Sequence, residues 1–186
     1  MVVAAEDIRW GPVAFLTSLH VGAVAAMAVL TDCHWGTVAL GCALIPISQF
    51  GITGGAHRLW AHRSYKASAP YRGAVMCCNS IANQGTIYHW VRDHRVHHAH
   101  SETDADPHDA RRGCFFSHIG WLCVRKSSAV VEAGRQLDLS DLEADAFVRL
   151  QRALHPAWNV VWCFGVPAVV ATQIWGESPL NALLVP

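Results

Sequence analysis

The sequence predicts an all-α membrane protein with three transmembrane helices and a helical segment between the second and the third. Composition is the first reason: of 186 residues only 15% are charged and 52% are hydrophobic, whereas soluble domains usually carry about 25% charged residues. Lys+Arg and Asp+Glu are equal at 14 each, so no excess of positive charge indicates a nucleic-acid partner, and we expect none. The placement of the charges is the second reason.

Three long stretches carry no charged side chain: residues 10–31, 33–57 and 153–176. An α-helix rises ~1.5 Å per residue, so about 20 residues cross the ~30 Å hydrocarbon core of a bilayer. We therefore predict transmembrane helices at about residues 10–31, 34–56 and 157–176, in contact with the lipid bilayer.

A fourth uncharged stretch, residues 73–91, has a different character. It contains amide and hydroxyl side chains, among them Asn79, Ser80 and Gln84. Such groups are costly in lipid when they lack partners. This stretch therefore predicts a helix that packs against the rest of the protein.

The basic residues predict the orientation in the membrane. Every Lys and Arg except Arg9 lies between Arg58 and Arg152. Because basic segments beside transmembrane helices stay in the cytoplasm, we expect residues 57–154 to be cytosolic.

Histidines form two groups next to the predicted membrane surface. His94, His97 and His98 follow an i, i+3, i+4 spacing, which places three imidazoles on one face of a helix. His57 and His62 are five residues apart, roughly 140° around an α-helix, so we expect them to flank a site at a helix end.

Imidazole is a good ligand for iron, copper, nickel and zinc. Five histidines in two groups exceed the four ligands of a structural zinc site, which indicates two metals or one metal with open positions. The alternative is a set of cationic histidines at the membrane surface, and their grouping favours the metal. His89, five residues before His94, is a further possible ligand.

The sequence motifs around these histidines resemble those of the acyl-CoA Δ9 desaturase (stearoyl-CoA desaturase) family. Residues 51–66 (GITGGAHRLWAHRSYK) resemble its first histidine box, and residues 90–98 (WVRDHRVHH) resemble the second. The similarity continues through residues 101–113 and 115–121 and runs from about Arg9 to the end, so we expect one desaturase domain over residues 1–186.

The resemblance implies a fold and an activity. The family consists of four-span endoplasmic-reticulum enzymes that use a di-iron centre and O2 to introduce a cis double bond into a saturated acyl-CoA. Their electrons come from NADH through cytochrome b5 and its reductase. The iron ligands implied by position are His57, His62, His94, His97 and His98. The residues implied to contact the substrate are Arg92, Asp93, Arg125, Lys126 and Trp90.

Some of these roles have open alternatives. The cations can also be explained by the topology of the protein, and Trp90 either lines an acyl tunnel or simply packs. Asp104, Asp106 and Asp109 either orient ligand imidazoles from a second layer or form turns beside Pro107.

The sequence also departs from the family pattern. The family's third box, another HxxHH, and a further histidine ligand have no counterpart in these 186 residues. We therefore expect this chain to be the N-terminal portion of a desaturase, unable to assemble a complete di-iron site by itself. Pro12 and Gly85 replace family asparagines that contact substrate, and His89 replaces a glutamate.

Two other functions compete with this hypothesis. A membrane di-iron hydroxylase or a desaturase of another lipid would carry similar boxes, but the words around Arg92 favour acyl-CoA. A histidine-rich metal transporter or metal-binding membrane protein would place ionisable residues inside its spans. His20 is the one histidine or charged residue inside a predicted span, since His34 stands at the first position of the second, and this weighs against transport.

Overall fold

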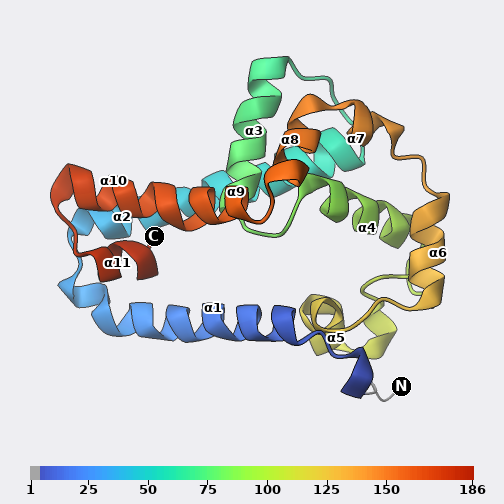
Figure 1. Ribbon diagram of the computed structural model, residues 1–186, viewed down its shortest axis with the longest axis horizontal. Coiled ribbons are helices and arrows are strands. Elements are labelled where there is room, and N and C mark those ends of the chain that lie inside the picture. The colour runs from blue at the N-terminus through green and yellow to red at the C-terminus, as the bar shows by residue number, and fades with distance from the viewer. Residues whose placement is uncertain (1–4) are drawn as a thin grey trace. The chain divides into compact units, whose positions relative to one another are not determined.

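The computed structural model describes residues 5–186, which form helices and connecting loops (Figure 1). Among these residues there is no β-strand, and one isolated antiparallel bridge joins Ile8 to Val124. The all-α prediction is confirmed. The α-helices are α1 (Trp10–Val29), α2 (Trp35–Phe50), α3 (Ala69–Ile81), α4 (Ile87–His100), α5 (Cys114–His118), α6 (Ser128–Gln136), α7 (Ser140–Ala144), α8 (Ala146–Leu154), α9 (Ala157–Val160), α10 (Val166–Trp175) and α11 (Pro179–Leu184).

Three continuous helices are long and apolar enough to cross a membrane: Trp10–Asp32, Trp35–Ala61 and Ala157–Trp175. They match the three predicted spans. The second consists of α2 and a π-helical continuation, Gly51–Ala61, and the third contains a π-helical turn, Val161–Gly165, between α9 and α10. No side chain of α1 is buried, and Met27 is 68% exposed. A helix that is apolar on all sides and buries none of its side chains is suited to a lipid environment.

The chain divides into two compact units, and each is described by itself. The first comprises residues 1–20 and 92–139, and the second comprises residues 21–91 and 140–186. Two helices, α1 and α4, run across the boundary in the sequence.

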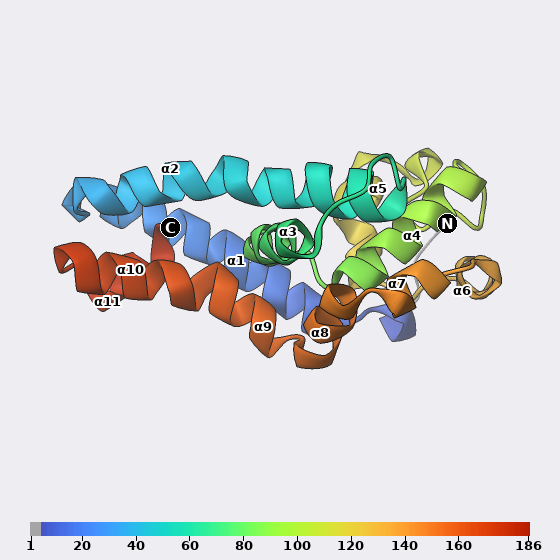
Figure 2. The same ribbon diagram turned by 90° about the horizontal axis from the view of Figure 1, so that it is seen from above.

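In the second unit, α3 packs against α2 and against the Val161–Gly165 turn, and α2 also contacts α10. Figure 2 shows α3 nearly end-on between the two continuous apolar helices Trp35–Ala61 and Ala157–Trp175. The approach is closest at Gly51, where a β-carbon would meet the Asn79 nitrogen at 2.2 Å. Only glycine fits there, because any side chain would collide with the backbone of α3.

Polar side chains inside the second unit satisfy one another. Gln151 is fully buried, and its amide donates to Asn79 Oδ1 at 3.0 Å and to Ser80 Oγ at 2.9 Å. Its oxygen accepts from the Ile87 amide at 2.8 Å, at the start of α4. This network explains how the uncharged stretch 73–91 buries amides, as predicted: α3 faces protein partners instead of lipid.

A carboxylate joins the far ends of the second and third spans. Glu177 Oε2 accepts from the Thr37 hydroxyl at 2.6 Å and from the His34 amide at 2.8 Å, at the first turn of α2. Trp175 at the end of α10 donates its indole to Thr37 Oγ1 at 2.8 Å. A negative charge at a helix N-terminus is favourable, so Glu177 stabilises both this helix start and its contact with α10.

The first unit is organised by a short backbone pairing. The Arg9 amide donates to the Cys123 carbonyl and the Arg125 amide donates to the Asp7 carbonyl, both at 2.8 Å. Val96 of α4 and Val130 and Ala133 of α6 are buried in this unit. The pairing fixes the start of α1 beside the segment that carries Arg125 and Lys126.

We expect stability to depend on the ionisation of Glu177. Hydrogen bonding from Thr37, helped by the neighbouring amides, holds the pKa of Glu177 below its usual value of 4.5. A carboxyl whose folded pKa is depressed stabilises the protein above its unfolded pKa, and this contribution is lost as the pH falls through the folded pKa. Glu177→Gln should therefore lower the melting temperature in detergent at pH 6 and flatten its decline below about pH 4.5. Glu132→Gln, on α6, is the control, and parallel curves for Glu177→Gln and wild type would contradict the assignment.

Candidate metal centre

The first histidine pair lies where the second span ends. The His62 amide donates to the His57 carbonyl at 2.9 Å, which is the i→i+5 bond of a π-helix. The two Nε2 atoms are 3.0 Å apart, and the rings are nearly perpendicular with centroids 4.5 Å apart. The wider π-turn brings together two side chains that an α-helix would separate by roughly 140°.

Trp90 and His89 lie near the start of α4. The Trp90 ring meets His57 edge-on with centroids 6.2 Å apart, and its indole donates to Gln84 Oε1 at 3.1 Å. His89 Nδ1 lies 3.0 Å from the Thr86 hydroxyl, which also accepts the His89 amide. Trp90 therefore borders the first pair. Nδ1 of His89 is engaged by the Thr86 hydroxyl at the start of α4.

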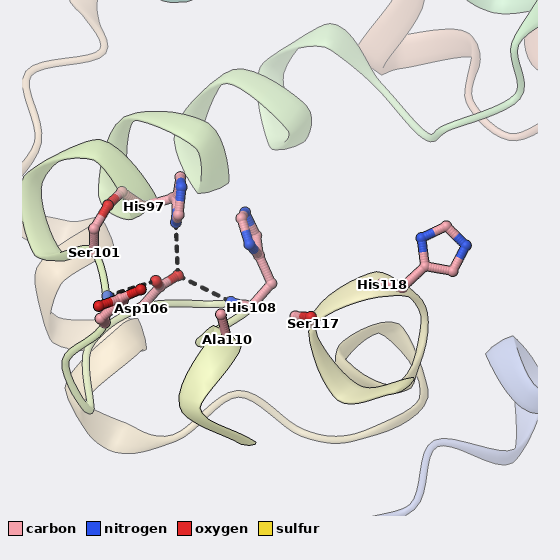
Figure 3. A pocket seen from close by; sticks show the side chains of 8 residues that line it. His97, Ser101, Asp106, His108, Ala110, Ser117 and His118 are labelled. Carbon is pink, nitrogen blue, oxygen red and sulfur yellow. Dashed lines mark hydrogen bonds and ion pairs between the residues drawn. The ribbon is translucent and has the colours of Figure 1, made fainter. Parts of the chain in front are cut away.

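The second group lies on the last turns of α4, and the structure divides it. His94 and His98, one turn apart, have ring centroids 4.5 Å apart. The His97 centroid is 6.3 Å from that of His94, and His97 Nδ1 lies 2.9 Å from Asp106 Oδ1 (Figure 3). All three imidazoles occupy one helix face as predicted, but His97 turns toward the following loop.

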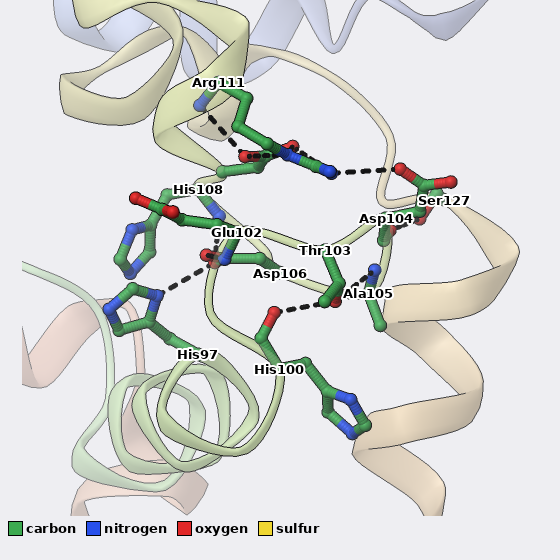
Figure 4. Close-up of polar contacts among 11 residues, drawn as sticks. His97, His100, Glu102, Thr103, Asp104, Ala105, Asp106, His108, Arg111 and Ser127 are labelled. Carbon is green, nitrogen blue, oxygen red and sulfur yellow. Dashed lines mark hydrogen bonds and ion pairs between the residues drawn. The ribbon is translucent and has the colours of Figure 1, made fainter.

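Asp106 is the buried centre of that loop, with only 1% of its side chain exposed. It accepts the Glu102 amide at 2.9 Å and the His108 amide at 3.1 Å, besides the His97 ring (Figure 4). Burial alone would raise the pKa of Asp106, but these hydrogen bonds and His97 outweigh it and hold the pKa below its usual value. The carboxylate engages Nδ1 of His97 and leaves Nε2 for a metal.

In the described part of the chain, the neighbouring Asp104 and Asp109 bind an arginine of the loop and no histidine. Asp109 accepts from Arg111 through both oxygens and caps the short helical turn Ala110–Arg112. Asp104 is paired with the same guanidinium and its side chain is 94% exposed. Of the three acids considered in the sequence, Asp106 is the one bonded to a predicted ligand.

His108 is a histidine to which the sequence analysis gave no ligand role. Its ring lies on that of His97 with centroids 4.1 Å apart. Possible ligand atoms of His97, Asp106 and His108 lie within 4.8 Å of one another, beside a cavity of about 560 Å³ that His118 of α5 also lines (Figure 3). Burial and the nearby charge of His97 lower the pKa of His108, which favours the neutral, metal-binding form. In the sequence, the Asp-Pro-His run at 106–108 is the feature that could have indicated a role for His108.

Two of the predicted substrate residues of the first unit, Arg92 and Lys126, meet at the carboxylate of a third, Asp93. Asp93 Oδ1 accepts from Arg92 at 3.0 and 3.1 Å and also from the Lys126 ammonium. Burial lowers the pKa of Lys126, and Asp93 opposes this effect. Arg125, the neighbour of Lys126, is held through its backbone by Asp7. One carboxylate between two cations leaves a net positive charge, as an anionic ligand requires.

The donor set fits a metal. Metal–imidazole bonds are about 2.0–2.1 Å long, so two nitrogens at right angles around one ion lie about 3 Å apart. The His57 and His62 nitrogens, 3.0 Å apart, match this separation. Imidazole suits iron as well as copper and zinc.

Comparison with known proteins decides the family. The family model described as Fatty acid desaturase matches residues 34–186. The chain belongs to the fatty acid desaturase family. Stearoyl-CoA desaturase 5 of Bos taurus is 49% identical over 177 residues, covering 95% of this chain and 53% of that protein. Stearoyl-CoA desaturase of Homo sapiens is 46% identical over 176 residues, covering 95% and 49%. Acyl-CoA Delta-9 desaturase of Acheta domesticus is 47% identical over 181 residues, covering 97% and 50%.

This desaturase chain spans about half the length of the curated relatives it matches. Both predicted histidine boxes fall within the matched residues. Together with the three apolar helices, family membership makes it a membrane protein. The resemblance identified from the histidine boxes is confirmed.

We expect Asp106→Asn to loosen the 101–109 loop of this desaturase chain. An asparagine oxygen cannot accept all three hydrogen bonds, and a buried donor left without a partner costs about 1–3 kcal/mol. The melting temperature in detergent should fall, whereas the exposed Asp104→Asn should change it little. Equal melting temperatures for the two variants would show that the buried carboxylate contributes nothing to the loop.

Proposed function

We propose that this chain belongs to an acyl-CoA desaturase that introduces a cis double bond, at the Δ9 position, into a saturated acyl-CoA. The reaction uses O2 and electrons that arrive from NADH through cytochrome b5 and its reductase. The observation that carries the proposal is the pair of histidine boxes inside a sequence 45–50% identical to stearoyl-CoA and acyl-CoA desaturases.

The proposed iron ligands are the five histidines of the two boxes: His57, His62, His94, His97 and His98. The abutting nitrogens of the first pair and the engagement of His97 Nδ1 by Asp106 support this assignment. A di-iron centre held by these histidines would supply the oxidant for an unactivated C–H bond, which offers no handle for an acid or a base. The protein residues hold the imidazoles in place and exclude water from the acyl chain.

The proposed substrate contacts are Arg92, Asp93, Arg125, Lys126 and Trp90. A guanidinium and an ammonium held together by Asp93 give a forked donor and a point charge, which suit phosphate oxygens. The negative charge of Asp93 offsets the repulsion between the two cations and so allows them to lie close together. The edge contact of Trp90 with His57 supports a role for Trp90 in bordering the acyl chain.

The proposed location is the endoplasmic-reticulum membrane, with residues 57–154 in the cytosol. The basic residues of this segment support the orientation, because Arg58, Arg63 and Lys66 follow directly after the second span. Basic residues so close to a transmembrane helix remain on the cytoplasmic side.

Metal analysis tests the iron assignment. The 186-residue chain, purified in detergent and equilibrated with Fe²⁺ without oxygen, should retain iron after gel filtration. Replacing both His94 and His98 by alanine should weaken iron binding more than about tenfold, measured by mass spectrometry of bound metal. His20→Gln, the lone histidine of the first span, is the control. Retention of zinc with no affinity for iron would contradict the proposal and favour a metal-binding membrane protein.

Substrate binding tests the acyl-CoA assignment. Stearoyl-CoA should raise the melting temperature of the purified chain, and added salt should weaken this effect because phosphate contacts are screened. Lys126→Met should reduce the stabilisation by stearoyl-CoA, while Arg135→Gln, an exposed cation of α6, should not. Equal stabilisation by stearic acid and stearoyl-CoA would indicate a lipid substrate other than acyl-CoA.

A further inference from the structure

The residues around His62 are held by carboxylates far away in the sequence. Arg63 forms a two-pronged ion pair with Asp141, with Nε 2.9 Å from Oδ2 and Nη2 2.8 Å from Oδ1. The indole of Trp60 donates to Asp145 Oδ2 at 3.1 Å. Both carboxylates come from residues 140–145, which comprise α7 and the residue that caps α8; we call this segment the acidic strap. It therefore binds the chain on both sides of His62, at Trp60 and at Arg63.

The backbone at this point requires such support. Arg63 has a φ of +51°, in the left-handed region that non-glycine residues seldom occupy and hold only when the surroundings fix them. Directly after it, the Ser64 amide and hydroxyl both reach the Arg58 carbonyl at 2.9 Å. The π-helical segment therefore ends in a sharp turn immediately after His62, and the Arg63 side chain secures this turn to the acidic strap.

Asp145 connects the acidic strap to the core of the second unit. Its side chain is 6% exposed, and it accepts from Arg72 of α3 at 3.1 Å. Its other oxygen caps α8 through the Phe147 amide at 2.9 Å. Trp60, itself only 5% exposed, is thus fixed to two packed helices, while Asp141 holds the more exposed Arg63.

We propose that Asp141 and Asp145 are positioning residues for the first histidine pair. By anchoring Trp60 and Arg63, the acidic strap holds the π-turn that brings the His57 and His62 nitrogens to metal-binding separation. This inference rests on the proposed metal-binding role of the pair. It assigns a role in metal binding to residues that lie outside both histidine boxes.

Asp141 gives the sharper test, because Asp145 also caps a helix and its loss can unfold the protein. The Arg63 and Asp141 side chains are 55% and 31% exposed, and an ion pair this accessible contributes little to global stability. Asp141→Asn should therefore leave the melting temperature nearly unchanged. A metal-site effect can then be separated from unfolding.

The experiment has two measurements on the full chain in detergent. In the metal-free protein, diethyl pyrocarbonate should modify His57 and His62 at least about twofold faster in Asp141→Asn, because released rings reach solvent more often. In a Co²⁺ titration followed by visible absorption, the same variant should bind roughly tenfold more weakly. Asp141→Glu, which keeps the charge, should recover part of the affinity. Glu143→Gln should match wild type, because this side chain, on the same helix, accepts a long hydrogen bond from the Tyr88 hydroxyl at 3.4 Å and forms no hydrogen bond or ion pair with Trp60 or Arg63 within residues 5–186.

The two proposals fail in different ways. If wild type binds Co²⁺ and Asp141→Asn is indistinguishable from it in both measurements, the positioning role is overturned. If wild type binds no metal, the proposed metal centre fails. Unchanged labelling of His57 and His62 in the metal-free variant would then overturn the positioning role independently.

Discussion

The hydrogen bond from the His62 amide to the His57 carbonyl determines how the second transmembrane helix ends. It closes a π-turn, and a π-turn spaces its side chains differently from an α-turn. Everything proposed for the first histidine pair depends on this closure, because the contact of the two Nε2 atoms at 3.0 Å requires their side chains to project from the same side. The π-helical backbone therefore determines whether the two imidazoles can bind one metal ion together.

Buried carboxylates are the second recurring feature of this desaturase chain, and each holds a specific group. Asp106 fixes the His97 ring, Asp145 holds Trp60 and caps α8, and Glu177 joins two spans at their ends. A buried carboxylate is tolerated only when hydrogen bonds replace its lost hydration. Each of these accepts at least three, so the cost of burial is offset by fixing a ring, a helix start or a helix pair.

Polar groups between the apolar helices follow the same logic. Gln151 bonds to Asn79, Ser80 and the start of α4, and thus links α8 to α3 and to the start of α4. Beside lipid, such groups would lack partners. Their mutual satisfaction lets α3 insert between longer apolar helices, and the close approach at Gly51 depends on that insertion.

The sequence by itself determined the helical class, the three spans and the family. These depend on local properties: uncharged stretches long enough for a bilayer and a histidine spacing that matches one helix face. The comparison that confirmed the desaturase family covers residues 34–186, which include both histidine boxes. The iron ligands and substrate contacts remain proposals, supported by the local geometry of each group.

Only the tertiary structure decided which residues support those histidines. A five-residue spacing is compatible with α- or π-helical geometry, and the sequence gives no local signal for the latter, so the contact of His57 with His62 could not be foreseen. Among three similar aspartates, the path of the loop selected Asp106. Asp141 and Asp145 lie 78 and 85 residues from their partners. Contacts over such separations depend on how the whole chain packs, whereas periodicity and charge are properties of each segment alone.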